Sequence, residues 1–125
     1  MSLASVVAVT REAVERQRRA THDRIAELEG AFADIAASVD SANTDDEHDP
    51  EGATLAFERA QVVSLLDEAR ARLAALDDAA ARVATGTYGV CERCGRDIGV
   101  ERLTARPDAR QCVDCARTRR DRGRA

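Results

Sequence analysis

The chain is poor in aromatic residues and contains no lysine. Phe32, Phe57 and Tyr88 are its only aromatic residues, tryptophan is absent, and all 19 basic residues are arginine. A chain of 125 residues is long enough for one domain, but so few large side chains do not build a thick core. Ala, Arg, Asp and Glu dominate instead, and this composition favours long helices.

Signals for export and for catalysis are also missing. Residues 1–10 have neither the basic start nor the long apolar stretch of a signal peptide. We find no Ser-His-Asp pattern, phosphate-binding loop or open metal site. We therefore expect a cytoplasmic protein that is not an enzyme and has no membrane partner.

The four cysteines form two matched pairs. Cys91 and Cys94 make one C-x2-C unit, Cys112 and Cys115 make the other, and seventeen residues separate the two pairs. This spacing is typical of a zinc site in which each pair presents two thiolates to one tetrahedral ion. Four protein ligands leave no position for water, so we expect one structural Zn²⁺ and no catalytic metal.

Two other uses of the cysteines remain open. A disulfide framework is typical of small secreted chains, and the export signal of such chains is missing here. A thioredoxin-like redox pair is expected at the start of a helix, but Cys91 follows a Gly-Thr-Tyr-Gly turn and has a matched second pair. Zinc is the favoured interpretation.

Apolar residues recur with heptad spacing in two long segments, which predicts two helices that pack along one seam as an antiparallel hairpin. The first series is Val7, Val14, Thr21, Ile25, Leu28, Phe32, Ile35 and Val39, and the second is Leu55, Val62, Leu66, Ala69, Leu73, Leu76, Ala80 and Val83. In the first two heptads Arg11 and Arg18 occupy one of the two rows. We expect a weaker seam there, which contacts another module or lets the arginines reach outward.

The ends of the second helix are marked in the sequence. Asp49-Pro50-Glu51 is a typical start, with a capping carboxylate, a proline in the first turn and an acid near the positive end of the dipole. Gly86 is a typical stop. The predicted helix has about 36 residues and a length of roughly 54 Å.

The sequence thus predicts a mainly α protein with two parts. Residues 1–85 form a helical hairpin with an acidic tip at 41–52, and residues 86–125 form a four-cysteine zinc module with an arginine-rich C-terminal helix. The tip acids are Asp45, Asp46, Glu47 and Asp49. On composition alone, a solvated turn explains this loop as well as a partner-binding tip does.

A further pattern surrounds the cysteines. It consists of Gly86-Thr87-Tyr88-Gly89-Val90-Cys91-Glu92-Arg93-Cys94-Gly95, then Ile98, Arg102-Leu103, Ala105-Arg106-Pro107 and Cys112-Val113-Asp114-Cys115. This pattern resembles the zinc module of the DksA/TraR family of bacterial transcription regulators. The resemblance is specific over residues 86–115, and the hairpin with an Asp-Pro tip agrees with the architecture of the family.

The resemblance implies a protein that binds bacterial RNA polymerase and inserts its hairpin into the secondary channel. The acidic tip would then act on basic groups or Mg²⁺ near the active centre. Direct DNA binding is not expected, because the chain has a net charge of -4 and a DNA-binding protein usually carries a basic surface.

Two departures from the family limit what the resemblance implies. Its tip pattern is Asp-x-x-Asp-x-Ala, whereas this chain has Asp49-Pro50-Glu51-Gly52-Ala53-Thr54, so only Asp49 carries over. We hypothesise that Asp45, Asp46 and Glu47 replace the missing charge. Of three basic positions that hold the alarmone ppGpp in the family, only Arg106 is kept, and Ala75 and Ala116 stand at the others. A polyphosphate needs several charged donors, so weak or absent ppGpp synergy is expected.

A second function class stays open on the sequence alone. A zinc-stapled helical adaptor that binds another protein, or nucleic acid through residues 116–125, has the same features. We interpret the arginines of that stretch first as a solvated helix end whose cations complement the dipole.

Overall fold

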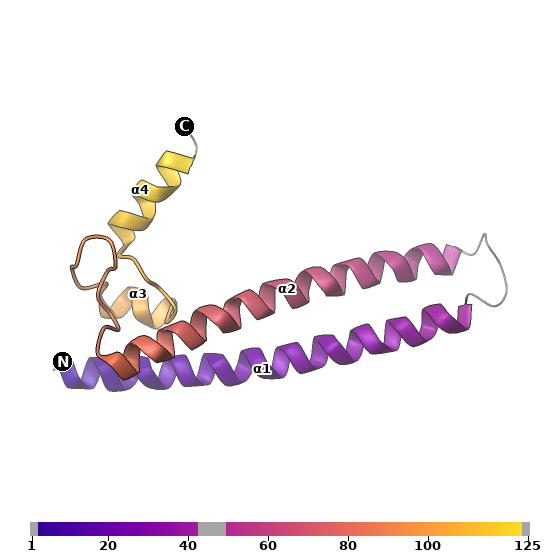
Figure 1. The fold of residues 1–125 in the computed structure, drawn as a ribbon, viewed down its shortest axis with the longest axis horizontal. Coiled ribbons are helices and arrows are strands. Elements are labelled where there is room, and N and C mark those ends of the chain that lie inside the picture. Colours follow the sequence, from indigo (N-terminus) through magenta and orange to yellow (C-terminus); the bar gives the residue numbers. More distant parts are fainter. Residues whose placement is uncertain (1–2, 43–49, 124–125) are drawn as a thin grey trace. The chain divides into compact units, whose positions relative to one another are not determined.

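The computed structural model describes residues 3–42 and 50–123, with side chains described for residues 8–39 and 52–119. Its helices are α1 (Leu3–Ala42), α2 (Pro50–Thr85), α3 (Val100–Ala105) and α4 (Val113–Gly123) (Figure 1). The only β pairing in the described part of the chain is one antiparallel bridge between Val90 and Asp97. The predicted fold class is confirmed: a mainly α protein with a helical hairpin, a cysteine-bearing module and a C-terminal helix.

The predicted ends of the second helix are confirmed where the structure describes them. α2 begins at Pro50 and ends at Thr85. Gly86 follows with φ +77°, a conformation that glycine adopts without a steric penalty. The amide of Thr87 then donates to the carbonyl of Arg82 at 3.0 Å, which satisfies one of the free carbonyls at the helix end.

The chain forms two compact units, which we describe separately. We call residues 20–73 the hairpin unit, and residues 1–19 with 74–125 the zinc unit. The predicted domain division into residues 1–85 and 86–125 stays a prediction, since these units reflect packing and not independent folding. None of the described helices has an apolar stretch long enough to cross a membrane.

In the hairpin unit, α1 and α2 pack along the predicted seam. Leu28 and Leu66 are buried, with 6% of each residue exposed. The other predicted seam residues are half-buried: Ile25, Phe32, Ile35, Val39, Leu55, Val62, Ala69 and Leu73. Arg59 occupies a seam position, and its guanidinium lies 5.3 Å from the centre of the Phe32 ring. This cation–π contact puts a charged residue where the heptad pattern calls for an apolar one.

In the zinc unit, an arginine occupies a seam position near the start of α1, as the heptad pattern indicated. Arg18 donates to Asp77 of α2 at 2.9 Å and to Glu15 at 3.0 Å. These groups are exposed to solvent, so the pairs contribute well under about 1 kcal/mol to stability. Apolar contact is kept by Val14 and Leu76, which are almost fully buried.

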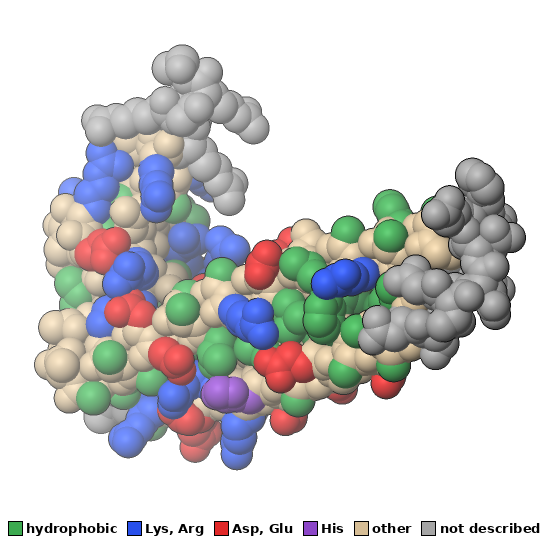
Figure 2. All heavy atoms as spheres, turned by 45° about the vertical axis from the view of Figure 1, so that its right-hand side comes forward, with side chains coloured by type: hydrophobic (Ala, Val, Ile, Leu, Met, Phe, Trp, Pro, Cys, Tyr) green, Lys and Arg blue, Asp and Glu red, His purple; other side chains and the backbone are tan. Residues whose placement is uncertain are grey.

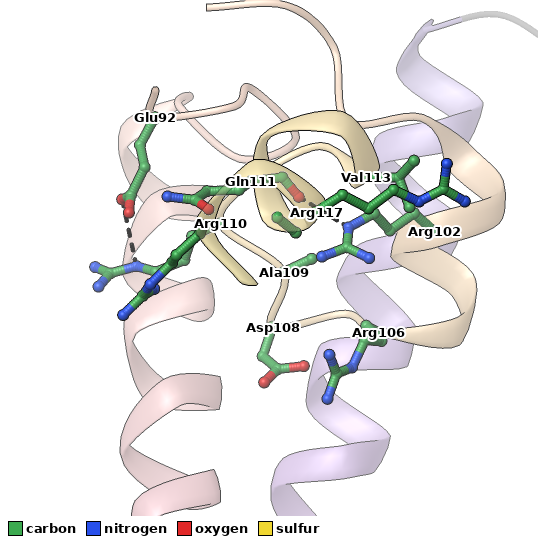
Figure 3. Close-up of a pocket in the computed structure, with 11 residues that line it drawn as sticks. Glu92, Arg102, Arg106, Asp108, Ala109, Arg110, Gln111, Val113 and Arg117 are labelled. Carbon is green, nitrogen blue, oxygen red and sulfur yellow. Dashed lines mark hydrogen bonds and ion pairs between the residues drawn. The ribbon is translucent and has the colours of Figure 1, made fainter. Parts of the chain in front are cut away.

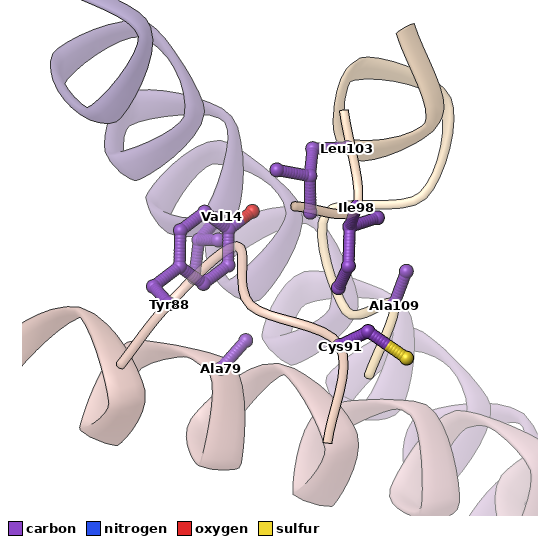
Figure 4. Close-up of a cluster of buried hydrophobic side chains, with 7 residues drawn as sticks. All are labelled: Val14, Ala79, Tyr88, Cys91, Ile98, Leu103 and Ala109. Atoms are coloured by element: carbon purple, nitrogen blue, oxygen red, sulfur yellow. The ribbon is translucent and has the colours of Figure 1, made fainter. Parts of the chain in front are cut away.

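The core of the zinc unit joins the helices to the cysteine module. Its members are Val14, Ala79, Tyr88, Cys91, Ile98, Leu103 and Ala109 (Figure 4). Val14 comes from α1 and Ala79 from α2, and the other five come from the segment that contains the cysteines. The prediction that the start of the first helix contacts another module is therefore confirmed at Val14.

Candidate metal centre

The four cysteines come together at one point. Their sulfur atoms all lie within 4.8 Å of one another, and the Sγ atoms of Cys94 and Cys112 are 3.8 Å apart. Four sulfurs placed tetrahedrally around Zn²⁺ at 2.3 Å are separated from each other by about 3.8 Å. All four cysteines are free thiols, and a disulfide needs sulfurs only about 2.05 Å apart. The sulfur positions thus fit a zinc ion.

Short backbone hydrogen bonds shape the first cysteine pair. The amide of Gly95 donates to the carbonyl of Cys91 at 2.9 Å, and Gly95 has φ +76°. The amide of Cys91 donates to the carbonyl of Arg96 at 2.8 Å. A glycine at this positive φ lets the chain turn back tightly, so that both sulfurs of the pair face the same side.

A helix start positions the second pair. Cys112 directly precedes α4, and Cys115 lies in its first turn. The amide of Ala116 donates to the carbonyl of Cys112 at 3.0 Å, so the helical hydrogen bonding begins at a ligand. The spacing of three residues places the two cysteines on the same side of the turn.

The electrostatics of the cluster favour a cation. Backbone N–H groups of Cys94 and Cys112 that point at the Cys91 sulfur lower the pKa of Cys91 to about 6. Hydrogen bonding to Cys112, followed by desolvation, raises the pKa of Cys115 to about 12. Cys91 is thus held as a thiolate and Cys115 as a thiol, and a divalent metal ion displaces the proton of Cys115 when it binds.

The donor set and the fold identify the ion as a single structural zinc. Thiolates are the ligands that Zn²⁺ takes in closed four-coordinate sites, and no position is left for substrate or water. Cys91, Cys94, Cys112 and Cys115 would hold it. Within the described ranges, no other group of His, Cys, Asp and Glu side chains clusters in this way. Bound zinc would join the Cys91 turn to the start of α4.

Ion pairs connect the cysteine segment to α2. Arg110 contacts Asp78 at 2.5 Å and Glu92 at 3.5 Å, and Asp78 also pairs with Arg82 at 3.4 Å. Arg82 also donates a hydrogen bond to the carbonyl of Ala109 at 3.4 Å. Sequence reasoning missed this network, because Asp78 lies off the heptad seam and nothing local to Arg110 indicates its partner.

A pocket of about 700 Å³ lies beside the metal centre, on the side formed by α3, α4 and the segment between them. Figure 3 shows arginine side chains around it. Its lining residues are Glu92, Arg102, Arg106, Asp108, Ala109, Arg110, Gln111, Val113, Ala116, Arg117 and Arg119. Arg102 donates to the carbonyl of Gln111 at 2.8 Å. The sequence had indicated only Arg106 here, because the other arginines are far apart along the chain.

The acidic tip lies outside the described residues. Asp45, Asp46, Glu47 and Asp49 all fall between α1 and α2, in residues 43–49. Their role as a tip that contacts a partner stays a prediction.

Comparison with known proteins gives a family for the cysteine segment. Residues 86–120 match the model of the prokaryotic dksA/traR C4-type zinc finger. An uncharacterized protein of Aquifex aeolicus is 48% identical over 46 residues, which are 37% of this chain and 32% of that protein. The RNA polymerase-binding transcription factor DksA of Escherichia coli K12 is 39% identical over 49 residues, which are 39% of this chain and 32% of that protein. The matched segments thus span about a third of the length of these relatives.

A solved structure extends the similarity to almost the whole chain. The transcription factor DksA2 from Pseudomonas aeruginosa matches with a TM-score of 0.81 and 26% sequence identity. The match covers 97% of this chain and 88% of the DksA2 chain. The fold of almost the whole chain is therefore similar to that of a known transcription factor.

Proposed function

We propose that the protein is a transcription regulator that binds bacterial RNA polymerase, because its cysteine-bearing segment matches the prokaryotic dksA/traR C4-type zinc finger. The observation that carries the proposal is the match to DksA2 over 97% of the chain, since it includes the hairpin as well as the zinc finger. The DksA relatives of Haemophilus influenzae and Escherichia coli are RNA polymerase-binding transcription factors, which supports the choice of partner.

We propose that the hairpin enters the secondary channel of the polymerase. Its two helices pack along one narrow seam, so a thin element reaches a site that a globular domain does not. Asp45, Asp46, Glu47 and Asp49 would then bring negative charge toward the active centre. There they would act on bound Mg²⁺ or on basic side chains and so change the lifetime of promoter complexes.

Zinc supplies no chemistry to this function beyond a rigid cross-link. It would fix the segment that carries Tyr88, Ile98 and Leu103, which form the core with Val14 and Ala79 of the hairpin helices. The metal centre thereby holds the ends of α1 and α2 in one unit. The protein binds its partner and catalyses nothing, and it acts in the cytoplasm, where the polymerase is.

Two further ligands are expected to contribute little. Direct DNA binding is not proposed, because the chain is acidic overall. For ppGpp, Arg106 is the one contact that the family pattern supports, and it lies in the arginine-lined pocket. Arg110 of the same pocket is already paired with Asp78 and Glu92.

The test is the capture of purified core RNA polymerase by the immobilised, zinc-loaded protein. We expect the wild type to retain polymerase, and a variant lacking residues 41–52 and the adjoining helix turns to lose it. A control variant in which the four tip acids become amides keeps the hairpin and should still bind. A wild type that captures another protein or nucleic acid instead of polymerase would favour the adaptor.

A further inference from the structure

Arginine side chains are concentrated around the pocket beside the metal centre. Arg102 and Arg106 come from α3 and its C-terminal end, and Arg117 and Arg119 come from α4. Figure 2 shows arginine side chains gathered along α4. The complete lining holds five arginines and two carboxylates, an excess of three positive charges, in a chain whose net charge is -4. The arginine-lined pocket is therefore a basic site in an acidic protein.

Most of these arginines are not used by the fold. The guanidinium groups of Arg106, Arg117 and Arg119 make no hydrogen bond or ion pair with any residue that the structure describes. Arg102 uses its Nε for a 2.8 Å bond to a main-chain carbonyl, which fixes the direction of its side chain. Arg110 is the exception, because it pairs with one acid of the cysteine segment (Figure 3) and with one acid of α2. Like charges around one hollow repel one another, and a bound anion relieves that repulsion.

The size of the pocket and the chemistry of arginine limit the kind of anion. A guanidinium is a planar fork that pairs bidentately with a carboxylate or a phosphate. The volume of about 700 Å³ lies within the range of about 300–1,000 Å³ that is typical of sites for small ligands. The pocket thus has room for a phosphate-bearing molecule or for a few residues of a peptide.

Two features of the lining favour a peptide with carboxylates over phosphate groups. Val113 has 43% of its surface exposed and lies next to the half-buried Ala116, and an apolar side chain of a peptide covers both. Glu92 and Asp108 also line the pocket. Successive phosphates would meet these acids, whereas a peptide places neutral residues between its carboxylates. The pocket fits an acidic peptide segment that also carries an apolar side chain.

We propose that the arginine-lined pocket receives an acidic segment of RNA polymerase. The carboxylates of that segment pair with Arg106, Arg117 and Arg119, and its apolar side chain covers Val113. This inference rests on the proposed function and adds a contact made by the zinc unit, separate from the acidic tip. Arginine is among the residue types that carry most of the binding energy at protein interfaces, so the contact contributes directly to affinity.

The first experiment measures the affinity of zinc-loaded variants for purified core polymerase. Arg117→Glu/Arg119→Glu should bind at least about 10-fold more weakly than the wild type, because the reversed charges repel the acidic segment. The matched control is Arg11→Glu/Arg19→Glu, which changes the net charge equally at exposed positions of α1 outside this pocket. It should bind within about twofold of the wild type. Both variants should melt at the wild-type temperature, because none of the four side chains has a partner among the described residues.

The second experiment identifies the group that occupies the pocket. The chain has no lysine, so Arg117→Lys introduces a single side-chain amine and keeps the positive charge. A water-soluble carbodiimide activates a partner carboxylate, and the amine attacks it to form an amide while the urea leaves. Mass spectrometry of the complex with polymerase should show an amide between position 117 and an Asp or Glu of a polymerase subunit. Arg11→Lys is the control and should give no amide to polymerase at position 11.

Each contrary result has a distinct meaning. Equal affinity of Arg117→Glu/Arg119→Glu and its control overturns the docking site and leaves polymerase binding standing. A complex in which position 117 reaches no polymerase carboxylate does the same, and an amide between two copies of this chain assigns the pocket to a second copy instead. If the α4 variant loses binding of inorganic tripolyphosphate or duplex DNA but keeps its affinity for polymerase, the pocket serves phosphate groups and the inference is overturned. A wild type that fails to bind polymerase overturns the proposed function itself, and the docking site with it.

Discussion

The phenol of Tyr88 donates a 2.8 Å hydrogen bond to the main-chain carbonyl of Pro107. Both residues are buried, and they lie nineteen positions apart, Tyr88 shortly before the first cysteine pair and Pro107 shortly before the second. The bond closes this segment at a point away from the sulfur atoms. Two links therefore hold the zinc module together: the metal ion bound by the four cysteines and the hydrogen bond from the buried Tyr88 side chain to Pro107.

Replacement of Tyr88 by phenylalanine should remove the hydrogen bond to Pro107 and lower the stability of the zinc module. The ring and its packing are kept, but the carbonyl of Pro107 is left without its donor, which costs about 1–3 kcal/mol for a buried group. The measurement is the free energy of unfolding of the zinc-loaded protein in urea. Phe57→Leu, a change at an exposed position, serves as the control and should leave stability unchanged. Wild-type stability in Tyr88→Phe would contradict the assigned role of the bond.

High pH should destabilise the zinc unit through the same residue. Burial raises the pKa of Tyr88, although a hydrogen bond with Thr10 and the charge of Arg82 partly oppose the shift. The stability that comes from the raised pKa is fully present below the unfolded value of about 10, and it is lost as the pH rises through the folded value. Tyrosinate absorbance reports this residue alone, since the chain has one tyrosine and no tryptophan. The folded protein should titrate at higher pH than the urea-unfolded chain, and identical midpoints would contradict the prediction.

Loss of the metal should disorder the module and spare the hairpin. Structural zinc contributes on the order of 10 kcal/mol in small modules, and few large apolar residues are present here to replace it. We expect Cys91→Ser to disorder residues 87–115 while most helical circular dichroism remains. Backbone NMR spectra with and without zinc test this, and re-addition of zinc to chelated wild type is the control. An unchanged module after complete metal removal would be the opposite result.

Asp49→Asn should separate activity from binding. The change removes one charge at the tip and keeps the shape of the side chain, so polymerase affinity should stay within about twofold of the wild type. The effect on promoter-complex lifetime should fall, because the charge near the active centre is what acts. Asp67→Asn, on the exposed surface of α2, is the matched control and should behave as wild type. Equal activity of Asp49→Asn and wild type would refute the role of the tip.

The alarmone ppGpp should change the transcriptional effect by less than about twofold. Ala75 and Ala116 replace two of the three basic groups expected from the family pattern, and a polyphosphate requires several charge-assisted donors. The measurement is promoter-complex lifetime with and without ppGpp, using wild type and Arg106→Ala. A large gain with wild type that disappears in Arg106→Ala would show that the other arginines of the pocket complete the site.

Local patterns in the sequence correctly predicted the two long helices and the grouping of the four cysteines. The seam residues from Ile25 to Val39 and from Leu55 to Val83 are buried or half-buried as the heptads require. Gly86 ends α2 because the left-handed conformation at that point is inexpensive only for glycine. The cysteine spacing was sufficient to group the four sulfurs, since each pair is fixed by its own short turn.

Contacts between distant residues were decided by the tertiary structure. No periodicity pairs Arg110 with Asp78 or Tyr88 with Pro107, because each contact exists only after the cysteine segment has folded onto the helices. The arginine-lined pocket has the same origin, with side chains brought together from α3, α4 and the segment between them. Spacing along the chain determines what a helix or a turn does locally. The packing of the whole unit decides which surfaces of these helices and turns come into contact. That packing involves residues that are far apart in sequence.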